Sequence, residues 1–234
     1  MSQHIVSSYD RDLESIQALV LRMGGLVEAS ILDAAQSMDT RDLELAADVR
    51  RRDKAIDELE IKINEASATC IALRAPVSKD LRTVLTVMKI AGSLERIGDY
   101  SKNMAKRTNV LAEQRLLDGQ TATLRRMARE VQGMLKDALD AFIQRDAELA
   151  EQVRLRDQDI DQMYNTAFRE FLTFMMEDPR NITPCMHLHF IAKNIERMGD
   201  LVTNIAEQVV YLVTGDLPED PRPKMDTTSL STKV

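Results

Sequence analysis

Residues 90–107 read IAGSLERIGDYSKNMAKR, and residues 191–208 read IAKNIERMGDLVTNIAEQ. Equivalent positions differ by 101 residues, as Glu95 and Glu196 do. In the first stretch Glu95, Asp99 and Asn103 recur at every fourth position, so on a helix their oxygen-bearing side chains form one row. Neighbouring carboxylates in such a row repel each other. Their presence in both halves indicates that a cation lies against each row.

The duplication extends beyond this motif. Residues 41–46 (RDLELA) match residues 145–150 (RDAELA), and residues 49–57 (VRRRDKAID) match residues 153–161 (VRLRDQDID). The difference between these segments is 104 residues rather than 101, so the second half has lost residues between this segment and the motif. Length changes of this kind are absorbed in loops. The sequence therefore predicts one structural unit that occurs twice.

The hydrophobic pattern predicts that this unit consists of three helices. Apolar residues recur at alternating steps of three and four, and turn residues interrupt the pattern at Thr40, Pro76, Asp118-Gly119 and Asp178-Pro179. We also expect Ser78 to cap the third helix. The predicted helices cover approximately residues 10–39, 45–75, 78–109, 121–143 and 146–176, followed by one that ends by Gly215.

The predicted fold is therefore all-α, with two tandem pseudo-symmetric three-helix bundles and six helices. The first bundle occupies residues 9–112 and the second residues 120–214. Residues 215–234 contain several prolines and no apolar period, so we expect a disordered tail.

Composition excludes some classes of function. The 234 residues carry a formal net charge of −7, which argues against nucleic acid as a partner, because a phosphate-binding surface needs an excess of basic residues. No apolar run approaches the roughly 18 residues that span a bilayer, and the N-terminus has no basic region followed by an apolar one. We therefore expect a cytoplasmic protein.

The acidic row is expected to lie outside the core of its bundle. In the third helix, Ile90 and Leu94 belong to the buried stripe, whereas Glu95 continues a second, outward row that is apolar from Leu81 to Met88. Paired aspartates on the second helix of each repeat are placed to approach the same surface, so four carboxylates converge per repeat. The candidate metal ligands are Asp53, Asp57, Glu95, Asp99 and Asn103, with Asp157, Asp161, Glu196, Asp200 and Asn204 in the second repeat.

Oxygen ligands favour hard cations such as magnesium, manganese, ferric iron or calcium over zinc. A redox di-iron centre is disfavoured, because neither motif has a histidine at the Glu-x-x-His spacing of such bundles. His189 does lie on the second acidic row, but Met88 takes its place in the first repeat, which is more typical of an ordinary, partly buried histidine.

An ion-pair lattice is an equally good explanation of the acidic rows. Arginines near the motifs are able to neutralise the carboxylates without a metal, and spacing alone does not distinguish the two interpretations. These arginines are Arg50, Arg52, Arg96, Arg154, Arg156 and Arg197.

Each motif also contains a glycine, Gly98 or Gly199. Glycine weakens a helix by about 1 kcal/mol relative to alanine. We therefore expect another backbone to approach closely at both positions.

Taken together, four segments of the chain closely resemble the PhoU family. They are residues 80–82 (DLR), 94–103 (LERIGDYSKN), 175–180 (MMEDPR) and 195–207 (IERMGDLVTNIAE), and the resemblance covers about residues 9–214. PhoU proteins are accessory proteins of phosphate transport and regulators of phosphate signalling in bacteria.

The resemblance implies two PhoU-like bundles side by side, a cytoplasmic homodimer and multinuclear metal binding at the acidic rows. It also implies a non-enzymatic role, in which contacts with the phosphate ABC transporter ATPase and a sensor histidine kinase repress the starvation response when phosphate is plentiful. The protein is then expected to reach the membrane only through these partners. Three alternatives remain: a metal-dependent enzyme on a helical bundle, an accessory protein of a different phosphate carrier, and a metal-free adaptor.

Overall fold

The computed structural model describes residues 2–114 and 121–218, and these residues contain no strand. The all-α prediction is therefore confirmed. Six long helices form in the expected order, with one 3₁₀ turn before the last. They are α1 (Ser2–Thr40), α2 (Leu43–Arg74), α3 (Lys79–Ala112), α4 (Ala122–Gln144), α5 (Ala147–Glu177), η1 (Pro179–Asn181) and α6 (Ile182–Thr214).

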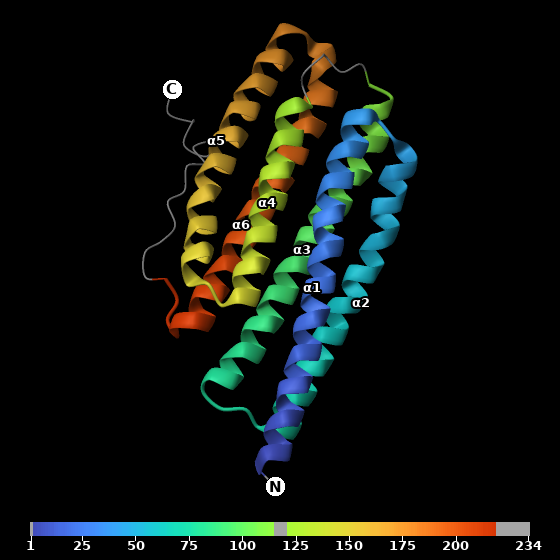
Figure 1. Cartoon of the computed structure of the whole chain (residues 1–234). Helices are drawn as coiled ribbons and strands as arrows, with labels where there is room; N and C mark the ends of the chain where they lie inside the picture. The colour runs from blue at the N-terminus through green and yellow to red at the C-terminus, as the bar shows by residue number, and fades with distance from the viewer. Residues whose placement is uncertain (1, 115–120, 219–234) are drawn as a thin grey trace.

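The helices form two three-helix bundles that lie side by side (Figure 1). Helices α1, α2 and α3 pack on one another, as do α4, α5 and α6. The bundles meet where α1 packs against α4 and α3 packs against α6. Buried apolar residues form one cluster through both bundles, from Met23 in α1 to Ile205 in α6. The two repeats therefore share a continuous core.

The second helix of each repeat begins in the same way. Asp42 accepts hydrogen bonds from the backbone N–H groups of the second and third residues after it, and Asp146 does the same at the start of α5. The residue before each cap is left-handed, with φ of 56° at Arg41 and 57° at Arg145. A left-handed residue followed by an aspartate cap reverses the chain sharply between antiparallel helices.

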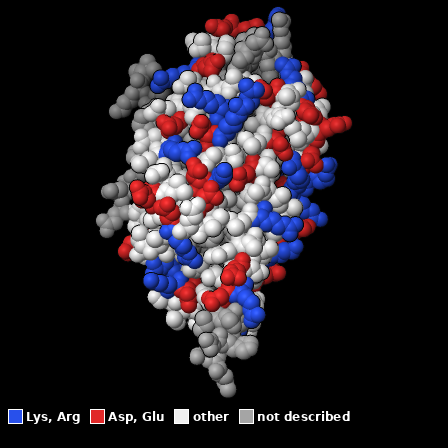
Figure 2. Space-filling view, in the orientation of Figure 1, with Lys and Arg blue, Asp and Glu red and all other residues white. Residues whose placement is uncertain are grey.

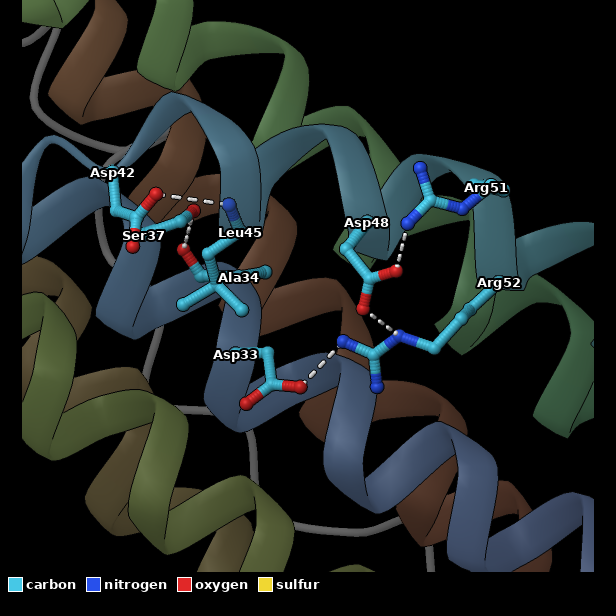
Figure 3. A network of polar contacts seen from close by, with 8 residues as sticks. All are labelled: Asp33, Ala34, Ser37, Asp42, Leu45, Asp48, Arg51 and Arg52. Atoms are coloured by element: carbon cyan, nitrogen blue, oxygen red, sulfur yellow. Dashed lines mark hydrogen bonds and ion pairs between the residues drawn. The ribbon is translucent and has the colours of Figure 1, made fainter.

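The first and second helices of each repeat are also tied together alike. Arg52 of α2 donates to Asp33 of α1 over 2.5 Å and pairs with Asp48 over 2.7 Å (Figure 3). In the second repeat Arg156 of α5 donates to Asp137 of α4, also over 2.5 Å. Both residues of this pair are displaced by 104 positions, so the duplication reaches into the first helices.

Some predicted boundaries were wrong. Helix α1 begins at Ser2 rather than near residue 10, and α3 continues to Ala112. The side chain of Ser78 makes no capping hydrogen bond, because Ser78 has a φ of 52° and not the extended backbone that an N-cap side chain requires. The predicted break at residues 118–119 and most of the predicted tail lie outside the described residues.

Helix α1 meets the length and composition of a membrane span between Tyr9 and Thr40. By this measure the expectation that no segment approaches such a span was wrong. A core helix of a bundle meets the same test, and α1 packs against α2, α3 and α4. Its apolar stripe, which includes Val20 and Val27, is fully buried. The bundle core accounts for this buried stripe, whereas Leu21 and Leu32 of the same helix are exposed.

Candidate functional site

In the first repeat, packing of α2 against α3 gathers the predicted acidic residues. The Lys102 ammonium contacts the Asp53 carboxylate on α2 and lies 3.4 Å from Oδ1 of Asp99 on its own helix. Asp53 is buried, whereas Asp57, Glu95 and Asp99 are half-buried. The expected convergence of carboxylates from two helices is therefore present in the structure.

The crowding of negative charge changes the acidity of this cluster. Burial raises the pKa of Glu95 above its ordinary value, and the charge of Asp99 raises it further. Burial, followed by the charge of Asp53, likewise raises the pKa of Asp57. Proximity to Glu60 on α2 contributes to both shifts. The cluster is thus an environment in which an additional cation is favoured.

Two residues of this cluster were missed by the sequence analysis, Glu60 and Lys102. Both break the internal repeat, since Tyr164 stands in place of Glu60 and Thr203 in place of Lys102. A search for duplicated residues passes over them. The available signal was helical spacing: Glu60 lies seven residues after Asp53, and Lys102 three residues after Asp99.

The second repeat buries its acids more deeply. Asp157, Asp161 and Glu196 are only 2%, 4% and 6% exposed, while Asp200 is half-buried and Asn204 exposed. The expectation that the acids lie on the outer surface was therefore wrong for the second repeat. The physical reason is that α5 and α6 pack so closely that the acidic row of α6 borders their interface.

A lysine also accompanies these buried acids. The Lys193 ammonium lies 2.8 Å from Oε1 of Glu196 and 4.8 Å from the centre of the Tyr164 ring. Lys193 corresponds to Gly92 in the first repeat. The two repeats thus place lysines at different positions, and each lysine pairs with a different member of its acidic cluster.

The arginine lattice is not what the structure shows for Arg52 and Arg156. As described above, Arg52 pairs with Asp33 and Asp48, and Arg156 with Asp137, none of which belongs to the acidic rows. Arg154 pairs with Glu151 and Glu207. Arg50, Arg96 and Arg197 are exposed.

The acidic clusters have the chemistry of a hard-cation site. Oδ1 of Asp53 and Oε2 of Glu196 are buried without a hydrogen-bond partner, and such atoms are costly unless a cation or donor reaches them. Within the described ranges, however, no three His, Cys, Asp or Glu side chains already stand where one metal ion would bind them. The donor set fits a hard cation, but binding requires the side chains to move.

The motif glycines make room for side chains of the neighbouring helix, not for its backbone as expected. A Cβ on Gly98 would lie 3.1 Å from Cδ1 of Ile56 on α2. A Cβ on Gly199 would lie 2.9 Å from Oδ1 of Asp157 on α5. The glycines thus let the first of the paired aspartates, Asp53 or Asp157, and the isoleucine three residues after it pack against the motif helix.

His189 lies among aromatic side chains. Its ring centre is 5.4 Å from that of Phe168 and 6.0 Å from that of Tyr164. Burial lowers the pKa of His189, and the nearby charge of Lys193 lowers it further. This environment is that of a partly buried aromatic histidine.

The model of the PhoU domain matches the chain twice, at residues 20–108 and 124–209. The chain belongs to the PhoU family. The double match confirms the PhoU resemblance inferred from the motifs, and its two segments coincide with the two bundles.

Curated PhoU relatives align over nearly their whole length. A protein of Rhizobium meliloti (strain 1021), named phosphate-specific transport system accessory protein PhoU homolog, is 43% identical over 226 residues, covering 97% of this chain and 95% of its own. The protein of the same name from Caulobacter vibrioides (strain NA1000 / CB15N) is 43% identical over 229 residues, covering 98% and 100%.

Solved PhoU structures share the fold. The crystal structure of PhoU from Pseudomonas aeruginosa superposes with a TM-score of 0.86 at 38% identity, covering 89% of this chain and all of that one. The phosphate transport system regulatory protein PhoU from Streptococcus pneumoniae gives a TM-score of 0.82 at 30% identity, covering 91% and 100%. The arrangement of two bundles is thus that of experimental PhoU structures.

Proposed function

We propose that this protein is a regulatory accessory protein of phosphate transport that acts by binding and not by catalysis. It represses phosphate uptake and the starvation response through contacts with the phosphate ABC transporter ATPase and its sensor histidine kinase. The supporting observation is the 43% identity, over nearly the full length, with relatives named as phosphate transport accessory proteins.

We place this role in a cytoplasmic homodimer that reaches the membrane only through its partners. Nucleic acid does not suit the surface of the protein. The net charge is −7, and on the face shown in Figure 2 the basic side chains are interspersed with acidic ones. A surface of this kind releases few counterions from a phosphate backbone.

The acidic clusters are proposed to hold magnesium, manganese or ferric ions. A bound cation would neutralise carboxylates that otherwise repel one another. In the first repeat Asp53, Asp57, Glu95 and Asp99 would supply charged oxygens. Asn103 follows one turn after Asp99, and its Oδ1 accepts a hydrogen bond from Lys106 over 3.3 Å. In the second repeat the equivalent residues are Asp157, Asp161, Glu196, Asp200 and Asn204.

Metal binding is tested by Asp99→Asn and Asp200→Asn. An amide keeps the shape of the side chain but loses the charge that a hard cation requires, so each variant is expected to retain less metal. Elemental analysis of protein purified without chelators measures this. Wild-type protein with no divalent or ferric ion above background would contradict metal binding and leave the lysines as counter-ions.

A partner surface is proposed beside the acids of the first repeat. Leu85 of α3 is 42% exposed, and Leu81 and Met88 on the same row are half-buried. This apolar row leads directly to Glu95 along the helix. An apolar surface that adjoins a charged one is typical of a protein interface.

The regulatory role is tested by deletion and by Leu85→Glu, which places a charge in the apolar row. Both are expected to leave the phosphate-starvation genes active in high phosphate. Leu43→Glu is the matched control, because Leu43 is 49% exposed but lies at the opposite end of the first bundle. Normal repression in a deletion strain without a homologue would refute the regulatory role.

A further inference from the structure

Among the described residues, Lys102 is the basic side chain that pairs with carboxylates of the first acidic cluster. Its ammonium contacts the Asp53 carboxylate and lies 3.4 Å from Oδ1 of Asp99, so it bridges α2 and α3. The Asp53 side chain is 4% exposed, whereas the Lys102 side chain is 30% exposed. The lysine thus reaches from the surface into a buried carboxylate.

The ammonium occupies the space that a metal ion would need. A hard cation bound by Asp53 and Asp99 has to lie between their oxygens, where Nζ of Lys102 now lies. Two cations in contact with the same oxygens repel each other strongly in a partly buried site. Ammonium and metal are therefore alternatives at this position.

The second repeat lacks a lysine in this position. Thr203 replaces Lys102, and its hydroxyl donates to the carbonyl of Gly199 over 2.9 Å, so it is bonded to its own helix. Lys193 reaches Glu196 from the preceding turn of α6 instead. The bridging lysine is thus specific to the first repeat.

We propose that Lys102 is an exchangeable counter-cation of the first repeat, which a metal ion displaces when it binds Asp53 and Asp99. This inference rests on the proposed metal binding and adds its regulation. In the metal-free protein, Lys102 keeps the buried Asp53 carboxylate paired. Because a metal ion has to displace the lysine, a higher metal concentration is needed to occupy the site in the first repeat. Binding also releases the lysine side chain towards the solvent.

The test is titration of the full chain with Mn²⁺, followed by calorimetry, in an Asp200→Asn background that weakens the second repeat. Lys102→Met removes the competing charge but keeps most of the side-chain length. We expect the dissociation constant of the Lys102→Met protein for Mn²⁺ to fall by about tenfold or more, because the ion no longer has to displace a positive charge. Lys102→Arg keeps the charge and is expected to bind like the lysine protein.

Lys54→Met is the matched control, because Lys54 lies next to Asp53 in the sequence but its side chain is 82% exposed and pairs with Glu58 at 3.9 Å. We expect its dissociation constant to stay within about twofold of the lysine protein, since exposed charges are screened by solvent. Tightening by Lys54→Met as large as that by Lys102→Met would show a general charge effect and overturn the exchange.

Thermal unfolding gives a second readout. Without metal, Lys102→Met should melt at a lower temperature because Asp53 loses its partner, and Mn²⁺ should raise its melting temperature more than that of the lysine protein. If Lys102→Met does not fold, Lys102→Gln serves in both measurements. If the protein with Lys102 and the Lys102→Met variant bind Mn²⁺ with equal dissociation constants, the exchange is overturned but metal binding is not. Failure of both to bind Mn²⁺ would overturn the metal site itself.

Discussion

The two repeats differ at the end of the bundle where the second helix finishes and the third begins. Helix α1 has 39 residues and α4 has 23, so the first turns of α1 have no counterpart in the second repeat. These turns pack along the α2–α3 end, where the Tyr9 hydroxyl donates to the carbonyl of Asp80 over 3.2 Å. Arg74 pairs with Asp12 there over 2.9 Å. The additional N-terminal turns of α1 therefore cover this end of the first bundle.

Aromatic side chains take over this role in the second repeat. Phe171 and Phe174 stand where the first repeat has Ser67 and Cys70. Phe171 is 1% exposed, and Phe174 packs against the core. We infer that side-chain volume fills the space that helix turns fill in the first bundle. The second repeat thus has a shorter first helix and larger core side chains at this end than the first repeat.

Phe171→Ala is expected to have the largest effect on this comparison. It removes a buried ring that no helix turn replaces, and such truncations lower the free energy of unfolding by about 3–5 kcal/mol. Ser67→Ala at the equivalent position should be nearly neutral, because the Ser67 hydroxyl is buried without a hydrogen-bond partner. Urea unfolding measures both. A loss as small for Phe171→Ala as for Ser67→Ala would mean that Phe171 does not seal the bundle.

The motif glycines provide a sharper, smaller difference. Gly199→Ala places a Cβ 2.9 Å from the buried Asp157 carboxylate, so we expect a loss of about 1–2 kcal/mol in the free energy of unfolding despite the better helix propensity of alanine. Gly98→Ala meets the flexible end of Ile56 at 3.1 Å and should change stability by less than about 1 kcal/mol. Equal losses in guanidinium unfolding would show that the two motif helices pack equally tightly.

The helix caps should reveal the remaining symmetry. Asp42→Ala and Asp146→Ala each remove an aspartate that accepts two backbone N–H groups, with donor–acceptor distances of 2.9–3.0 Å in both cases. Each is expected to lower the free energy of unfolding by about 1 kcal/mol. Asp159→Ala, at an exposed position within α5 that leaves both caps intact, serves as a control for lost surface charge. Clearly unequal losses would show that the turns are not energetically equivalent.

Helix order, the duplication and the spacing of the acidic rows were predictable because they depend on short-range periodicity, whereas the burial of the second row was not. A helix has 3.6 residues per turn wherever it lies, so apolar stripes and Glu-x-x-x-Asp rows are visible without neighbours. The start of α1 was not, because nothing in its first turns marks a boundary, and the Ser78 cap failed because its backbone is left-handed. The candidate ligands came from spacing combined with duplication, and the requirement for duplication excluded Glu60 and Lys102, since neither is repeated.

The sequence by itself thus determined two related three-helix units and the row of oxygen-bearing side chains on each. Only the tertiary structure decided which basic side chain meets those carboxylates and how deeply they are buried. Arg52 is closer in sequence to Asp53 than Lys102 is, yet Arg52 turns to α1 and Lys102 reaches Asp53 from α3. The physical reason is that ion pairs between helices depend on the rotation and register of each helix against its neighbour, which packing of the whole core sets.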